Sequence, residues 1–275
     1  MDAATPRFWG AQTSYLNFCE QDYVVTKYIA EFINTLSSLV YVVYGFYGLF
    51  NGRQNSPSGP RLVSYCGLIG VGVCSGAYHM TLKYHTQMSD ELSMHLLTTP
   101  LVYRVLTFNT SPQRTKLVGA ITLTLFTITM VAHMVMDEFI LHAVMFGLSV
   151  VIITVRITQL IPQRFSDPVV RKTLQTTARM GCLSFLFGYT LWLIDEFACR
   201  MLTDVRHLVG LPIAFLFELH GWWHVFTALG GYIGVAIVDL ITSGEVDQDP
   251  ISLFAWPVPF AVGLVSESST PKKQS

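Results

Sequence analysis

The sequence predicts an all-α polytopic membrane protein, a bundle of seven transmembrane helices. Of its 275 residues, 51% are hydrophobic and only 13% are charged, and the mean hydropathy is +0.46. The charged share is about half of the roughly 25% typical of soluble domains. Several apolar stretches approach the ~20 residues that cross a bilayer. The predicted spans are residues 31–50, 62–82, 88–108, 117–136, 139–160, 179–198 and 215–241.

The charge distribution predicts the orientation of these spans. The segment before the first span is polar and lacks the apolar core of a cleavable signal peptide, so we expect the first span to act as its own targeting signal. If the N-terminus is luminal, the loops and tail that face the cytosol carry most of the Lys and Arg residues. This bias predicts a luminal N-terminus and a cytosolic C-terminus. The chain then divides into a luminal segment (1–30), a seven-helix bundle (31–241) and a cytosolic tail (242–275).

The luminal segment contains a polar cluster in "NFCEQDYVVTKYIAE". Its oxygen-bearing side chains are those of Asn17, Glu20, Asp22 and Glu31. A hard cation such as Ca²⁺ takes six to eight oxygen ligands, including backbone carbonyls and waters. The spacing does not match an EF-hand. An ordinary solvated segment beside the membrane is therefore the alternative to a calcium site.

Two of the five cysteines fall on the predicted luminal side. Cys19 and Cys199 would meet an oxidising compartment if the chain enters the secretory pathway, and we predict that they form a disulfide. The sequence alone does not establish the pairing. The other three, Cys66, Cys74 and Cys182, lie in predicted spans and are expected to be packing residues.

The second and third spans bring polar groups to the luminal face. The second span ends in "SGAYHMTLKY", where Ser75 and His79 lie one helical turn apart and share a face. The third span starts near "MSDELS", which contains Asp90. Ser75 could instead bond to its own helix, and Ser89 and Asp90 could instead cap a helix N-terminus. Polar connectors at 51–61 and 109–116 bound these two spans.

The seventh span begins with "HGWWH", in which His220 and His224 share a helix face. Ionisable groups inside membrane spans are costly and usually functional. The pair therefore predicts two metal ligands, and hydrogen-bonded packing histidines are the alternative. Trp222 and Trp223 are expected to form part of the interfacial aromatic belt and of a pocket wall.

A catalytic zinc ion typically takes three protein ligands and keeps an open position. With a luminal N-terminus, the end of the second span and the starts of the third and seventh reach one membrane face. We therefore expect His79, His220 and His224 to converge near Asp90. The remaining histidines rank lower because none has a Ser or an acid at helical spacing on the same face; they are His85, His95, His133, His142 and His207.

Such a site predicts hydrolytic chemistry. Three imidazoles and an open position let zinc lower the pKa of a bound water to about 7 and polarise a carbonyl. Asp90 would then act as general base on that water and as acid toward the leaving amine. Ser75 would donate a hydrogen bond to the tetrahedral oxyanion.

The tail from residue 242 has the composition of a partly disordered segment. Its apolar patch at 251–264 is interrupted by proline, so we expect it to lie on the membrane and not to form an eighth span. The last residues, "KKQS", resemble a dilysine retrieval signal. This resemblance predicts a multi-pass protein of the endoplasmic reticulum membrane, with the Golgi as the alternative.

Several motifs together resemble the alkaline ceramidases, which are intramembrane amidases with seven spans. The resemblance covers about residues 9–245, in the same order and spacing as in the family. The motifs are "WGAQTSYLNFCEQDYVVTKYIAEFINT" (9–35), "CSGAYHMTLKY" (74–84), "SDEL" (89–92), "LIDEFAC" (193–199) and "HGWWHVFTALGGY" (220–232).

The resemblance implies specific roles for individual residues. It implies zinc binding by His79, His220 and His224, and catalysis by Ser75 and Asp90. It also implies a calcium site and supports the Cys19–Cys199 disulfide. The implied calcium ligands are Asn17, Phe18 through its carbonyl, Glu20, Asp22 and Glu31.

Positions 17 and 22 hold Asn and Asp where the animal members have Asp and Asn, and Phe18 replaces a Trp. The formal charge of the calcium site is thereby kept, so we expect calcium still to bind. "WGAQTS" together with the dilysine tail is compatible with fungal members that act on phytoceramide or dihydroceramide.

The expected function is hydrolysis of the ceramide amide within the membrane, by a zinc-activated water, to a sphingoid base and a fatty acid. The expected cofactors are Zn²⁺ and Ca²⁺ and the expected partner is a ceramide-type lipid, with no nucleic acid and no predictable protein partner. One alternative is a seven-span receptor of the progestin/adiponectin type. Another is a bis-histidine haem carrier, which two histidines on one helix disfavour because axial ligands approach haem from opposite faces.

Overall fold

The computed structural model describes residues 7–51, 58–136, 139–243 and 250–268. In these ranges the regular structure is helical, apart from one isolated bridge between Thr26 and Ile29. The elements are α1 (Phe32–Phe50), α2 (Gly59–Thr81), α3 (Tyr84–Thr107), α4 (Pro112–Met136), α5 (Phe139–Arg164), α6 (Pro168–Phe197), α7 (Cys199–Val209), η1 (Ile213–Phe217), α8 (Leu219–Ser243), η2 (Pro250–Leu253) and α9 (Val258–Ser268).

The all-α polytopic membrane fold predicted from the sequence is confirmed. Each predicted span overlaps one long helix, and α1, α2, α4, α5, α6 and α8 are long and apolar enough to cross a membrane. Helix α3 has 24 residues, a sufficient length, but it is more polar than the others because it buries Gln87, Glu91, Ser93 and His95 in the bundle.

Two parts of the helical structure differ from the sequence prediction. Helix α6 begins at Pro168, well before residue 179, because the Asp167 side chain accepts hydrogen bonds from the backbone N–H groups of Val169 and Val170. An N-cap aspartate followed by proline at the first helical position is a strong helix start. The short helix α7 was not predicted. It is amphipathic and buries Leu202 and Arg206.

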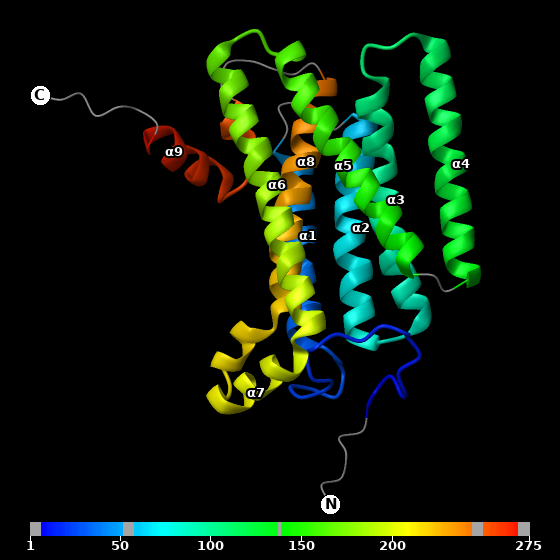
Figure 1. Cartoon of the computed structure of the whole chain (residues 1–275), viewed down its shortest axis with the longest axis vertical. Helices are drawn as coiled ribbons and strands as arrows, with labels where there is room; N and C mark the ends of the chain where they lie inside the picture. The colour runs from blue at the N-terminus through cyan, green and yellow to red at the C-terminus, as the bar shows by residue number, and fades with distance from the viewer. Residues whose placement is uncertain (1–6, 52–57, 137–138, 244–249, 269–275) are drawn as a thin grey trace, which may run out of the picture.

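The long helices run alternately up and down, as Figure 1 shows. The N-terminal segment, the α2–α3 turn and α7 lie together at one end of the bundle, and α9 lies toward the other end. Helix α8 packs against α1 and α6, whereas α4 stands at the edge and contacts α3 and α5. The luminal groups of the sequence prediction therefore share one end of the molecule.

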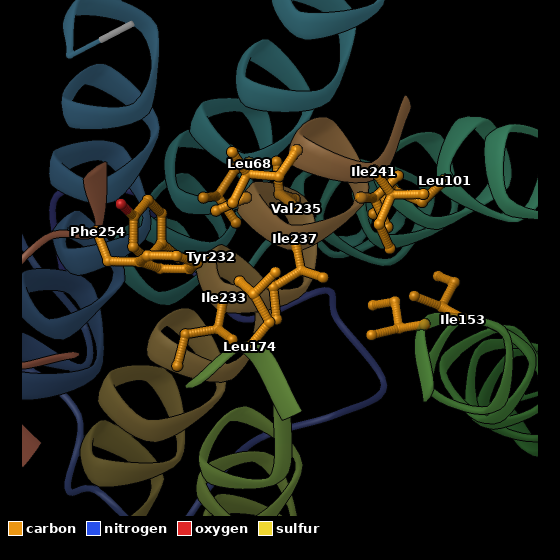
Figure 2. Close-up of a cluster of buried hydrophobic side chains, with 14 of the residues drawn as sticks. Leu68, Leu101, Ile153, Leu174, Tyr232, Ile233, Val235, Ile237, Ile241 and Phe254 are labelled. Atoms are coloured by element: carbon orange, nitrogen blue, oxygen red, sulfur yellow. The ribbon is translucent and has the colours of Figure 1, made fainter. Parts of the chain in front are cut away.

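The hydrophobic core surrounds α8. Figure 2 shows its side chains Val235, Ile237 and Ile241 packed among residues from α2, α3, α5 and α6. Helices α6 and α8 approach closely because both carry glycine at the crossing: a Cβ added at Gly230 would lie 2.8 Å from the carbonyl oxygen of Gly181. Small residues at helix crossings are the usual means of close packing in membranes.

The tail patch at 251–264 folds against the bundle through Phe254, Val258 and Val262, while Trp256 and Phe260 are exposed. With 11 residues, α9 is too short to span a membrane, as the prediction of no eighth span requires. The "KKQS" signal lies outside the described residues.

Candidate metal centre and active site

Three histidines from two helices meet at the end of the bundle that carries the N-terminal segment. His79 lies in the last turn of α2, and His220 and His224 lie in the first turns of α8. One ring nitrogen from each lies within 4.8 Å of the other two, and all three side chains are buried. Among the described residues, this is the one group of three or more His, Cys, Asp or Glu side chains converged in this way.

Neighbouring polar groups orient two of the three imidazoles. The Nδ1 atom of His79 contacts the Glu31 carboxylate, and the Nδ1 atom of His224 lies 2.8 Å from the Ser37 hydroxyl. With Nδ1 engaged, Nε2 of each ring is the atom left for a metal, which is the usual arrangement of ligating histidines.

The third imidazole supplies a direct test of whether a metal fits. The Nδ1 atom of His220 is buried and has no hydrogen-bond partner. A buried polar atom without a partner is costly, and a metal ion would satisfy it. Three imidazoles form a donor set that zinc commonly takes.

Ser75 lies beside the triad. Its hydroxyl is buried, 3.0 Å from that of Ser38 on α1 and 3.4 Å from Nε2 of His224. The hydrogen bonds described for Ser75 thus reach across to other helices and not back to its own, contrary to the alternative reading of this serine.

Asp90 lies inside α3. This helix begins at Tyr84 with Lys83 at the N-cap position, so the alternative that Asp90 caps the helix is wrong. The Asp90 side chain is half-buried, and its charge acts on Tyr41 and Tyr78.

These two tyrosines border the triad. The Tyr78 ring lies 4.8 Å from that of His79, and the Tyr41 ring lies 6.3 Å from that of His224. Asp90 therefore lies within electrostatic range of two residues that border the triad, and no direct bond between Asp90 and a triad histidine is described.

The N-terminal segment covers the triad. Phe18 stacks on His220 with 3.7 Å between ring centroids, and its backbone N–H donates to Glu31 over 3.1 Å. Glu31 also accepts a hydrogen bond from the side-chain amide of Asn34. Glu31 therefore joins the covering segment to His79.

Three acidic side chains, those of Glu20, Asp22 and Glu31, lie close to the part of the N-terminal segment that covers the triad. The Glu20 carboxylate accepts hydrogen bonds from the backbone N–H groups of Ile33 and Asn34. Burial, with a contribution from the charge of Glu31, raises the pKa of Glu20 to about 7. Burial also raises the pKa of Asp22, whose Oδ1 atom is buried without a partner.

The unpartnered Asp22 oxygen lies near the acid Glu31 and also near the cationic Arg7, and an oxygen in this setting fits a cation. The carboxylates of Glu20, Asp22 and Glu31 do not, however, converge as the histidines do. Asn17 is exposed, and its side-chain amide donates to Gln12 and also interacts with Asp22.

Cys19 and Cys199 form a disulfide that joins the N-terminal segment to the start of α7. Close to it, the Asp195 carboxylate accepts hydrogen bonds from the backbone N–H groups of Cys19 and His220, over 3.1 and 3.3 Å. Asp195 therefore connects α6 to the N-terminal segment and to the first turn of α8. The disulfide adds a covalent link from the same segment to the start of α7.

The lower-ranked histidines lie apart from the triad. His95, His133 and His142 are buried together between α3, α4 and α5, with 3.1 Å between Nε2 of His95 and Nδ1 of His142. His85 is exposed, and His207 contacts Gln21.

Sequence reasoning missed the contacts of Ser37, Ser38 and Asp195 with the centre, and the contact of Glu31 with His79. One signal was present, because Glu31, Asn34 and Ser38 recur at helical spacing on one face of the first span. Asp195 had no such spacing, although it lies in the "LIDEFAC" motif of the family resemblance.

A largely apolar cavity of about 250 Å³ lies beside the centre. Tyr41 and Thr227 line it, and the Tyr41 hydroxyl lies 2.5 Å from that of Thr227. Val151 of α5 and Leu186 of α6 also line the cavity, and both are more than half exposed on the outside of the bundle. The cavity therefore reaches the lipid-facing surface between α5 and α6. Trp223 lines it as well, as expected for a pocket-wall residue.

Comparison with known proteins gives matches over nearly the whole chain. Residues 10–266 match the ceramidase family model. The chain is 30% identical to alkaline ceramidase YPC1 of Saccharomyces cerevisiae over 251 residues, which is 86% of this chain and 79% of the yeast protein. It is 31% identical to alkaline ceramidase 3 of Mus musculus over 229 residues, 83% of this chain and 84% of the mouse protein.

Proposed function

The chain belongs to the ceramidase family, and we propose that it hydrolyses the amide bond of ceramides at a zinc ion held by His79, His220 and His224. The products are a sphingoid base and a free fatty acid. The observation that carries this proposal is the converged, buried histidine triad, which is followed by an apolar cavity whose lining residue Tyr41 lies next to His224. The receptor and haem-carrier alternatives find no support in the matched relatives.

Zinc at the triad would supply Lewis-acid chemistry, polarising a carbonyl and favouring ionisation of a water molecule. The residues around the triad prepare it for that ion. Glu31 and Ser37 hold the imidazoles of His79 and His224 with Nε2 available, and Phe18 shields His220 from solvent.

Asp90 and Ser75 would carry the proton and hydrogen-bond steps. Asp90 accepts a proton from the attacking water and returns it to the amide nitrogen as the C–N bond breaks. Ser75, beside His224, donates a hydrogen bond to the oxygen of the carbonyl as negative charge develops on it. The contact of Ser75 with His224, and the electrostatic effect of Asp90 on Tyr41 and Tyr78 beside the triad, support these roles.

The substrate's hydrocarbon chains would occupy the apolar cavity. Its walls come from α1, α2, α3, α5, α6 and α8, and its opening between α5 and α6 gives a membrane lipid a route that avoids water. A lipid of this kind places its amide at the polar end of the cavity, near Tyr41 and Thr227.

A calcium ion in the N-terminal segment is a second cofactor proposal. Asp22, Glu20 and Glu31 would supply carboxylate oxygens, with Asn17 and the Phe18 carbonyl as further ligands. The unpartnered Asp22 oxygen and the crowding of acidic groups support it. Because Glu31 also contacts His79, this ion would stabilise the cover over the zinc ligands.

We place the protein in the endoplasmic reticulum membrane, with the N-terminal segment in the lumen. The Cys19–Cys199 disulfide supports a luminal position for that end, since disulfides persist in oxidising compartments. The positive charge of the predicted cytosolic loops supports the same orientation.

The test is a joint measurement of zinc content and ceramide turnover in purified protein. His220→Ala is expected to abolish both, because two imidazoles do not complete the site. The control is His85→Ala, which removes an exposed histidine of α3 and should keep both. Full turnover by metal-stripped wild-type protein, or by the His220→Ala variant, would contradict the proposal.

A further inference from the structure

A buried carboxylate–histidine pair lies outside the metal centre. Glu91 of α3 contacts Nε2 of His133 on α4, and both side chains are nearly inaccessible. The Glu91 carboxylate also accepts hydrogen bonds from the Tyr15 hydroxyl, over 3.0 and 3.1 Å, and from the Gln87 amide, over 3.0 Å. One carboxylate thus joins the N-terminal segment to two helices.

Gln87 extends this link to the backbone of the N-terminal segment. Its side-chain oxygen accepts hydrogen bonds from the backbone N–H groups of Tyr15, over 3.0 Å, and Leu16, over 3.5 Å. The Tyr78 hydroxyl donates to the carbonyl of Leu16 over 2.9 Å. Residues 15 and 16 are therefore fixed on α3 and α2 through both side chain and main chain.

The fixed residues lead directly into the metal centre. Phe18 follows two residues after Leu16 and stacks on the ring of His220. A shift of residues 15 and 16 would be passed to Phe18 over a very short length of chain, and displacements of about 1 Å near a reacting group can cost about 100-fold in rate.

Few residues of helix α4 are buried. Its buried residues are Thr129, Met130 and His133, and the rest of the helix is half-buried or exposed. His133 is the ionisable member of these three, and its contact with Glu91 is a buried polar connection from this outer helix to the segment over the metal centre. A second, more exposed connection runs from the Met134 carbonyl through Tyr84 to the Thr13 hydroxyl.

We propose that the Glu91–His133 pair is a positioning device for the active site, which holds residues 15–18 so that Phe18 covers His220. Gln87 and Tyr15 connect the pair to this segment, because both side chains hydrogen-bond to Glu91 and Gln87 also accepts the backbone N–H groups of Tyr15 and Leu16. None of these residues lines the apolar cavity, so we expect their effect on turnover to pass through Phe18. This proposal rests on the proposed ceramide hydrolysis for its kinetic consequence, and its structural part can be tested separately.

The first experiment measures backbone hydrogen exchange at Tyr15 and Leu16 by mass spectrometry. His133→Ala is expected to raise exchange at these amides several-fold, because Glu91 loses its partner on α4. His133→Gln, which keeps an N–H donor, should restore protection, and Thr129→Ala, a buried change one turn earlier on α4, should leave it intact. Unchanged exchange in His133→Ala would overturn the proposal.

The second experiment is a double-mutant cycle on kcat/KM for ceramide. His133→Ala should lower kcat/KM about tenfold in the wild-type background and less than about twofold when Phe18 is already alanine, since coupled residues are not additive. Equal factors in both backgrounds would indicate a general structural role and overturn the proposal. If the wild-type protein has no ceramide turnover, the proposed function fails while the exchange experiment still tests the positioning.

Discussion

At the scale of single residues, Glu31 occupies the point where the two proposed metal sites meet. One carboxylate oxygen accepts the backbone N–H of Phe18, and the other contacts His79 and the amide of Asn34. A cation bound at Glu31 would therefore act, through this one side chain, on the orientation of His79, a proposed zinc ligand. The coupling runs in both directions, because binding energies between linked sites are reciprocal.

Asp22 provides the cleanest test of the calcium proposal. Asp22→Asn removes a negative charge and leaves the triad's own contacts untouched, so calcium affinity should fall by about tenfold or more. The measurement is the rise in melting temperature with added Ca²⁺. Glu196→Gln, a change at an exposed acid of α6, is the control and should preserve the wild-type response. An identical calcium response in Asp22→Asn and wild type would exclude Asp22 as a ligand.

The residues that could be predicted are those whose chemistry is unusual for their surroundings. Histidines in apolar helices stand out, and helical spacing alone pairs His220 with His224. Ser37 and Asp195 could not be found in this way, because a serine or an acid near a helix end is ordinary. Their contacts depend on the rotation of α1 and α6 against α8, which only tertiary packing sets.

At the scale of elements, a buried ion network ties α8 to α2 and α3 near the end of the bundle opposite the triad. Asp239 of α8 lies 3.1 Å from a nitrogen of Arg61 and 3.0 Å from one of Arg104. Arg104 also donates to the Ser64 hydroxyl. The three helices that carry Asp90 and all of the proposed zinc ligands are thus joined again at their far ends.

Asp239→Ala should destabilise the bundle by about 3–5 kcal/mol, because it removes a carboxylate that two largely buried guanidinium groups share. Thermal unfolding in detergent measures the loss. Asp204→Ala, at an exposed position of α7, should have little effect. Zinc content at low temperature should be retained in both variants, and an unshifted melting temperature for Asp239→Ala would refute the role of the network.

The spans themselves could be predicted because apolar length is a strong signal, whereas their ends could not. The early start of α6 depends on the Asp167 cap, which a window of hydropathy does not register. Helix α7 is amphipathic and lies against the end of the bundle, so neither its length nor its mean hydropathy distinguishes it from a loop.

At the scale of the whole molecule, the position of the cavity explains how one fold could serve a lipid substrate. The triad lies at one end of the bundle. The cavity lies between the helices beyond Tyr41 and Thr227, and part of its outer wall is exposed. No stretch of sequence predicts this cavity, because six helices contribute to it and each reads locally as an ordinary span. Its volume depends on where small residues leave space.

Gly234 of α8 is such a residue and allows the cavity to be tested. It lines the cavity, and a Cβ added there would meet no atom within 4 Å. Gly234→Leu should therefore place its side chain in the open space without displacing the helix. We expect turnover of a long-chain ceramide to fall by about tenfold or more, a short-chain ceramide to be affected far less, and zinc content to stay unchanged.

The matched control is Gly147→Leu on α5, where an added Cβ also meets no atom within 4 Å but the position faces outward and does not line the cavity. It adds the same side chain to another membrane helix and should leave both substrates unaffected. If Gly234→Leu slowed the two ceramides equally, the cavity would not be holding the acyl chain, since a filled chain pocket must discriminate by length. If it slowed neither, the hydrocarbon chains would have to bind elsewhere, and the opening between α5 and α6 would lose its role as the substrate's route from the membrane.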